Sequence, residues 1–193
     1  MTPDARSESN APFGLSWGMP HTSVEARFVG LAASAGKTDQ GACASLIYNL
    51  SAVAEVICAQ GGFCPAAFFS SPERSGDEVE FSFNDDRLSA VIVRFGYPFS
   101  IIGQDPDNLS DQAMTTLSRA EMQRLIFELS AKYGPPSVFT ETPKRSGMIH
   151  VQGSAQFLAR DDSVIFVMFG HDGGSALVGE LLYQPSIRAS GGF

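Results

Sequence analysis

The segment Glu78–Gly96, EVEFSFNDDRLSAVIVRFG, predicts two antiparallel strands joined by a tight turn, and the rest of the fold is built outward from it. Apolar and polar side chains alternate over Val79–Phe83, which is the pattern of a strand with one buried face. Asn84–Asp86 supply side chains that tolerate turn backbone, and the β-branched run Leu88–Phe95 returns as the second strand. We therefore expect the chain to be organised around a hairpin.

The chain after this hairpin predicts one helix followed by strands. Ser118–Glu121 has the spacing of a capping box, an apolar stripe follows it, and Gly134 ends the helix. Turns are predicted at Lys144–Gly147, Arg160–Asp162 and His171–Gly174. They separate strands that we expect at 137–142, 148–152, 155–159, 164–169 and 176–183.

The chain before the hairpin is less regular. Residues 1–12 are polar and contain proline, so we expect a disordered arm, and Phe13–Met19 alternates as a short strand does. A capping pattern at Thr22 predicts a helix that ends at Gly36. The apolar residues of 43–70 fit a helix ending at Gly61 or two strands equally well, and Pro65–Ser70 looks like a strand.

Two segments similar in character indicate an internal repeat. Val91–Gly96 (VIVRFG) and Ile165–Gly170 (IFVMFG) each follow an Asp-Asp turn. The pattern predicts an α+β fold, an antiparallel sheet built from two helix-plus-β-meander units with the helices packed on one face. A single domain, 13–185, would contain the units 13–100 and 115–185, and we expect a frayed tail at 186–193.

The composition excludes several classes of function. Hydrophobic residues make up 44% of the chain, which is typical of a globular protein. The formal net charge of −8 and the scattered basic residues argue against binding to nucleic acid or to an anionic membrane surface. An acidic surface is compatible with a basic protein partner, although it also serves solubility alone.

The first residues lack the basic patch and apolar core of a secretory leader, and no apolar run approaches the roughly 20 residues of a membrane-spanning helix. We therefore expect no membrane insertion and a cytoplasmic location, or a periplasmic one if a leader has been removed. Cys43, Cys58 and Cys64 have no zinc-binding spacing. Cys58 and Cys64 are close enough in sequence for a disulfide, and free thiols are the alternative.

The residue types of catalysis and metal binding form no known motif. His21, His150 and His171 share no ligand spacing. The loop Gly170–Ser175 holds the three residue types of a hydrolase triad, but neighbours on one turn point in divergent directions. Asp105–Asp111 lacks the glycine of a calcium loop. No metal or cofactor is predicted, and the sequence favours a non-enzymatic role.

A surplus of apolar side chains is the main functional signal. Both alternating sets are largely apolar in Leu88–Phe95 and in Val164–Phe169. If helices cover one face of the sheet, the other face needs a cover as well, either from the 43–70 segment or from a second protein chain. The candidate partner-binding residues are Arg94, Val164, Phe166 and Met168.

We therefore hypothesise a protein-binding module of the inhibitor, immunity or assembly-accessory type, which uses an apolar sheet face and an acidic surface. The partner would be another protein with a basic surface, and a homo-oligomer is compatible with the same face. The alternative is a small-molecule-binding or hydrolytic domain with a Phe-lined cavity, in which His150 or His171 is the polar group.

Three short motifs carry a resemblance to known proteins. Phe13–Met19 (FGLSWGM) before a capped helix, the hairpin Phe81–Val93 (FSFNDDRLSAVIV) and the helix end Leu129–Pro136 (LSAKYGPP) resemble small bacterial proteins of tandem α/β construction. These are related in outline to the β-lactamase-inhibitor-protein and BamE/OmlA outer-membrane lipoprotein folds. The resemblance implies a non-enzymatic scaffold whose sheet binds another protein. The chain departs from the lipoproteins because it lacks a leader with a lipid-acceptor cysteine.

Overall fold

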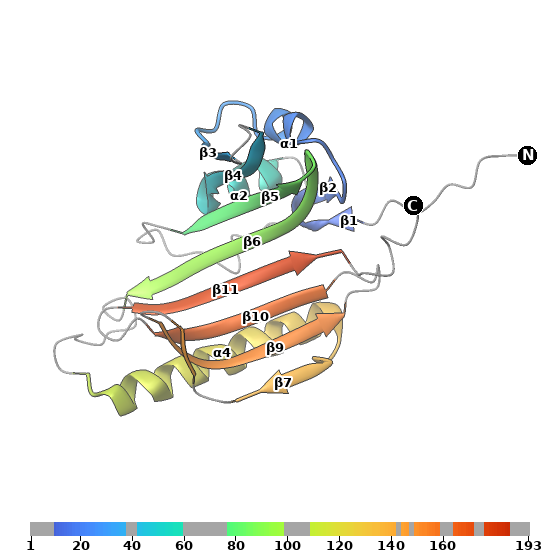
Figure 1. The fold of residues 1–193 in the computed structure, drawn as a ribbon. Helices are drawn as coiled ribbons and strands as arrows, with labels where there is room; N and C mark the ends of the chain where they lie inside the picture. Colours follow the sequence, from blue (N-terminus) through green and yellow to red (C-terminus); the bar gives the residue numbers. More distant parts are fainter. Residues whose placement is uncertain are drawn as a thin grey trace, which may run out of the picture.

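The structure, a computed structural model, describes residues 10–37, 42–59, 77–98, 109–141, 144–146, 149–158, 164–171 and 176–185. Its main feature is a nine-stranded antiparallel sheet with the strand order β3-β4-β5-β6-β11-β10-β9-β7, to which β8 (Lys144–Ser146) adds by pairing with β9 (Figure 1). Two further strands, β1 (Asn10–Ala11) and β2 (Leu15–Ser16), pair with each other.

The predicted hairpin is confirmed at the centre of this sheet. It consists of β5 (Glu78–Asn84) and β6 (Arg87–Pro98). The two residues between the strands, Asp85 and Asp86, have φ angles of 49° and 62°. Positive φ at both central positions gives the turn a twist that matches the twist of the flanking strands. The local residue pattern was sufficient to identify this element.

Each half of the sheet is a meander that follows a helix, as the sequence predicts. The first half is α1 (His21–Arg27), β3 (Ser34–Lys37), β4 (Cys43–Asn49), β5 and β6, with α2 (Leu50–Ala59) inserted between β4 and β5. The second half is α4 (Asp111–Tyr133), β7 (Val138–Thr140), β9 (Ile149–Leu158), β10 (Val164–His171) and β11 (Ala176–Gln184), with β8 between β7 and β9. β6 pairs antiparallel with β11 and joins the halves. The two similar segments lie on β6 and β10; β6 is the last strand of its half, whereas β11 follows β10, so the internal repeat stays a prediction.

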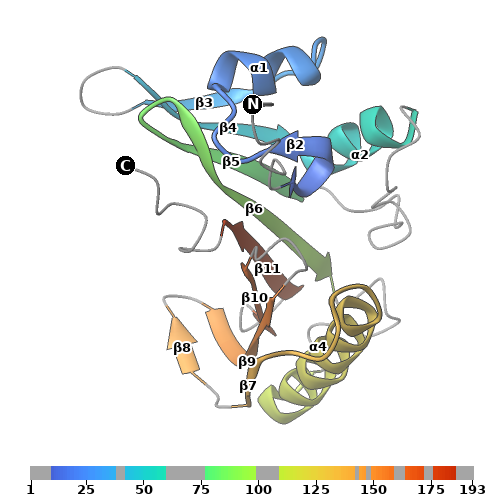
Figure 2. The same ribbon diagram turned by 90° about the vertical axis from the view of Figure 1, so that its right-hand side faces the viewer.

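One face of the sheet carries the hydrophobic core. Val93, Leu181 and Val167 are buried and lie side by side in the register of three neighbouring strands. Helices α2 and α4 lie on the same side of the sheet (Figure 2). At the end of α1, the Phe28 ring stacks on Phe81 with ring centroids 5.4 Å apart. Each buried side chain of this size contributes roughly 1.5–3 kcal/mol, so the core provides much of the driving force for folding.

The first helix is shorter than predicted. It ends at Arg27, whereas the apolar spacing predicts a helix as far as Gly36. Gly30 has a φ of 89°, which a right-handed helix does not allow, and the backbone turns there. Ser34–Lys37 then pairs with β4 as an edge strand. The spacing predicted the burial of Phe28 correctly but not the length of the helix.

The ambiguous 43–70 region is neither of the two predicted alternatives in its described part. Residues 43–49 form β4, and the chain passes directly into α2 (Leu50–Ala59). The side chain of Asn49 accepts a hydrogen bond from the Ala52 N–H, and the Asp77 carbonyl accepts one from the Leu50 N–H. The predicted strand Pro65–Ser70 and a Cys58–Cys64 bond lie outside the described residues.

Of the predicted disordered arm, residues 10–12 are described and residues 1–9 lie outside the described residues. Asn10 and Ala11 belong to β1, and Pro12–Gly14 forms a short 3-10 turn that leads into β2. Ala11 is buried in the core, so residues 10–12 are not part of a disordered arm. Of the predicted strand Phe13–Met19, only Leu15 and Ser16 are in a strand, β2. Leu15 is the buried residue of the two.

The long helix begins earlier than predicted. Ser110 caps it by accepting a hydrogen bond from the Ala113 N–H, and Ser118 lies inside the helix and is buried. The residues Ser118–Glu121 are compatible with helix interior as well as with a capping box, so the pattern misplaced the start. The end is as predicted, because Gly134 follows Tyr133 with a φ of 84°.

The second meander differs from the prediction in two strands. The predicted strands at 148–152 and 155–159 are one strand, β9, which continues through Gly153. A Cβ at Gly153 would lie 3.0 Å from the Thr140 carbonyl oxygen, so the glycine permits close approach of β7 rather than a turn. In the predicted turn Lys144–Gly147, residues 144–146 instead form the short strand β8. None of the helices in the described chain is both long and apolar enough to cross a membrane.

Candidate functional site

The face of the sheet opposite the core is the candidate site, and we call it the open face. The described helices pack on the core face through residues such as Val24, Val53 and Leu125, which all belong to one buried cluster. Figure 2 shows α2 and α4 on one side of the sheet, and no described helix lies on the other side. The described part of the 43–70 segment therefore does not provide the second cover.

A row of apolar side chains crosses the open face. Ile92 on β6 pairs in register with Leu182 on β11, and Leu182 pairs with Phe166 on β10. The alternation along each strand places these three residues opposite the buried Val93, Leu181 and Val167. Phe166 is 38% exposed, and Ile92 and Leu182 are half-buried. We call these three residues the apolar row.

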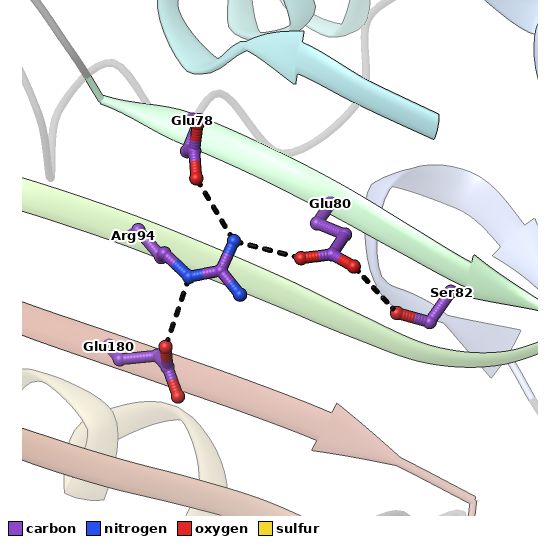
Figure 3. Close-up of polar contacts among 5 residues, drawn as sticks. All are labelled: Glu78, Glu80, Ser82, Arg94 and Glu180. Carbon is purple, nitrogen blue, oxygen red and sulfur yellow. Dashed lines mark hydrogen bonds and ion pairs between the residues drawn. The ribbon is translucent and has the colours of Figure 1, made fainter. Parts of the chain in front are cut away.

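A group of charged side chains lies beside the apolar row. Arg94 is in register with Glu78 on one neighbouring strand and with Glu180 on the other. Its Nη1 lies 3.0 Å from Glu78 Oε1 and 2.8 Å from Glu80 Oε2, and its Nε lies 3.2 Å from Glu180 Oε2 (Figure 3). Ser82 Oγ donates a 3.4 Å hydrogen bond to the other oxygen of Glu80. We call Arg94 and the three glutamates the Arg94 cluster.

The Arg94 cluster has a formal charge of −2, because three carboxylates surround one guanidinium. Partial burial by itself lowers the pKa of Arg94, but hydrogen bonds to Glu80 and Glu78 and the nearby carboxylate charges outweigh it and raise that pKa above its usual value. Arg94 is therefore positively charged at neutral pH, and its ion pairs hold the carboxylates together.

The four sequence-predicted binding residues fall on two strands, β6 and β10, which flank β11. Arg94 and Phe166 both belong to the open face, Arg94 in the cluster and Phe166 in the apolar row. Val164 and Met168 lie two residues on either side of Phe166 in β10. Their side chains are outside the described ones, so their part in the site stays a prediction.

Sequence reasoning missed the partners of these residues. The missed residues are Ile92, Leu182, Glu78, Glu80 and Glu180. Glu80 was visible only as the polar alternate of a half-buried strand. Its contact with Arg94 depends on the register between β5 and β6, and that of Glu180 depends on the pairing of two strands 86 positions apart. A local pattern contains neither piece of information.

The histidines of the alternative hypothesis do lie together. His150 and His171 are in register on β9 and β10, and their rings stack with centroids 4.8 Å apart and planes 17° from parallel. Nearly parallel rings direct their nitrogen lone pairs along separate planes, so this arrangement does not chelate one ion. The described residues contain no group of three or more side chains able to hold a metal. The third histidine, His21, instead bonds the side chain of Asp86.

Comparison with known proteins adds no relative: no family model, no curated protein and no solved structure matches this chain. The resemblance to the β-lactamase-inhibitor-protein and BamE/OmlA folds therefore stays a prediction. The candidate site rests on its own geometry.

Proposed function

We propose that this protein is a binding module that recognises another protein through the open face. The observation that supports the proposal is the apolar row, in which Ile92, Leu182 and Phe166 lie side by side on a face that no described helix covers. Burying the second face of a sheet that has apolar residues on both faces lowers the free energy, because it removes apolar surface from water.

The charge pattern indicates the kind of partner. The chain has a formal net charge of −8, and the Arg94 cluster places part of that excess directly beside the apolar row. Complementary charge accelerates association and disfavours partners of the same sign. The proposed partner therefore has a basic surface next to an apolar one, as an inhibited enzyme, a neutralised toxin or an assembly subunit could present.

The test is a pair of substitutions in the apolar row, Phe166→Ser and Leu182→Ser. An extract of the native cells that contains the wild-type chain is fractionated by size, and the protein that co-migrates with the chain is purified. The affinity of this purified protein for each variant is then measured by titration. We expect each variant to weaken binding at least about tenfold, because truncating a hot-spot side chain at the centre of an interface costs about 2 kcal/mol or more, and about 1.4 kcal/mol corresponds to tenfold.

Phe127→Ser is the matched control, because Phe127 is 77% exposed on α4, on the opposite side of the sheet. This variant should bind the partner as the wild type does. Thermal unfolding of all three variants shows whether the fold is retained. A wild-type affinity in folded Phe166→Ser and Leu182→Ser would reject the proposed function.

A further inference from the structure

We propose that the open face accepts a helical segment of the partner on which an arginine and an apolar side chain are neighbours. The arginine would reach the carboxylates of the Arg94 cluster, and the apolar side chain would pack on the apolar row. This inference rests on the proposed function and adds to it the chemistry that the partner must present.

The apolar row and the Arg94 cluster cannot be covered separately. Glu80 lies in register with Ile92, and Glu180 lies two residues from Leu182 on the same strand, which is about 7 Å. Any body that covers the apolar row therefore removes water from these carboxylates as well. Desolvating a cluster with excess negative charge is costly unless the partner supplies positive charge.

The carboxylates retain capacity for a second cation. Glu78 and Glu180 each give one oxygen to Arg94, at 3.0 and 3.2 Å, and within the described residues the second oxygen of each has no hydrogen bond (Figure 3). Both side chains are partly exposed, so a partner can reach them. Arginine suits a site rich in carboxylate oxygens better than lysine, because its planar guanidinium carries five N–H donors and stays charged.

A helix matches the spacing of the two features. Residues four apart on a helix have their Cβ atoms about 5–6 Å apart. This spacing is close to the distance of about 7 Å between Glu180 of the Arg94 cluster and Leu182 of the apolar row. The helix would pack on this face as α4 packs on the core face. A second copy of the same chain is disfavoured as the occupant, because it would bring two clusters of the same sign and two chains of net charge −8 together.

The experiment uses three synthetic peptides of about 20 residues, a length at which an isolated helix is stable enough to test. The first has arginine and leucine four residues apart, the second replaces arginine with its neutral isostere citrulline, and the third replaces leucine with serine. Amide chemical shifts of the full chain give the binding site and the dissociation constant. We expect the first peptide to shift the amide resonances of β6, β10 and β11. The citrulline peptide should bind at least about tenfold more weakly, because a charge-assisted hydrogen bond is lost.

The matching change in the protein is the double variant Glu78→Gln with Glu180→Gln. It should bind the arginine peptide about tenfold more weakly and should no longer distinguish arginine from citrulline, because the two changes remove the same interaction. Glu25→Gln with Glu55→Gln is the control of equal charge, since both residues are exposed on helices away from the open face. This control should bind as the wild type does.

The outcomes separate this inference from the proposed function. Equal binding of the arginine and citrulline peptides, with both weakened by Phe166→Ser, would overturn the arginine site and leave the open face as a binding surface. Equal loss in the two double variants would also overturn it, because general charge alone would then explain the result. Failure of the arginine peptide to shift the open face overturns the inference, whereas the proposed function is judged by the affinity of the purified partner.

Discussion

Ser118 shows at the scale of one residue how burial can override a sequence signal. Its hydroxyl was expected to cap a helix, but it is fully buried within α4 and its Oγ makes no hydrogen bond to any residue that the structure describes. A buried hydroxyl without a partner costs free energy, because it loses its hydrogen bonds to water on folding. Ser110 has the capping role instead.

Ser118→Ala should leave the free energy of unfolding unchanged or raise it by about 1 kcal/mol, because the variant removes an unsatisfied polar group. Ser110→Ala should lower it by about 1 kcal/mol, because the Ala113 N–H loses its acceptor. Urea unfolding of both variants measures the difference. A clear loss of stability in Ser118→Ala would show that its hydroxyl has a partner in solution.

The contact between Asp86 and His21 predicts that the stability of the fold depends on pH. A hydrogen bond from His21 is the largest cause that lowers the pKa of this carboxyl below its ordinary value. Because the pKa of Asp86 is lower in the folded state, the ionised carboxylate stabilises the fold above the pKa that Asp86 has in the unfolded chain. This stabilisation is lost as the pH falls through the pKa of Asp86 in the folded state. In His21→Ala, the pKa of Asp86 should rise toward the ordinary value, as an NMR titration of its carboxyl carbon would show. His150→Ala should leave that titration unchanged.

Among the secondary-structure elements, the turn between β5 and β6 follows from neighbouring residues alone, whereas the end of α1 depends on distant residues. The φ angles of Asp85 and Asp86 follow from residue types that tolerate left-handed backbone. The end of α1 depends on where Phe28 must lie to stack on Phe81, a residue 53 positions away by the chain numbering. Burial against the sheet is worth more than the weak helical preference of Phe28–Ser34.

Asp85→Gly tests the turn, because Asp85 is exposed and has a φ of 49°. Glycine adopts positive φ without steric cost, so the free energy of unfolding should rise by up to about 1 kcal/mol. Asp85→Val should lower it by about 1–2 kcal/mol, because a β-branched residue is strained in this conformation. Thermal unfolding of the two variants should therefore shift in opposite directions, and a common direction would contradict the turn geometry.

At the scale of the whole molecule, the pairing of β6 with β11 makes one structure of two meanders. These strands share eight register pairs, from Ala176 with Pro98 to Tyr183 with Val91. The core residues of both halves form one cluster. Neither half is therefore expected to unfold before the other.

Two probes in different halves test this expectation. Trp17, the single tryptophan, reports the first half by fluorescence, and the 23 residues of α4 dominate the helical circular dichroism signal. Urea unfolding curves from the two probes should coincide, because two-state unfolding gives one transition for every probe. Separate midpoints would show that the β6–β11 ladder does not couple the halves.

The features that depend on neighbours in the chain could be predicted from the residue pattern. These are the central hairpin, the helix end at Gly134, the α+β class and the apolar surplus of β6 and β10. Each follows from backbone preference or from periodicity within one element, so it can be read without knowing what the element packs against.

The features that depend on distant residues became known from the folded structure. β9 is one strand because it pairs with β10 on one side and with β7 on the other, and the Arg94 cluster depends on the register of three strands. Periodicity showed that Phe166 belongs to an apolar strand, but which face stays uncovered depends on where the helices pack. Local patterns do not contain these features, because strand pairing and packing minimise the free energy of the whole chain, to which residues far apart in sequence contribute together.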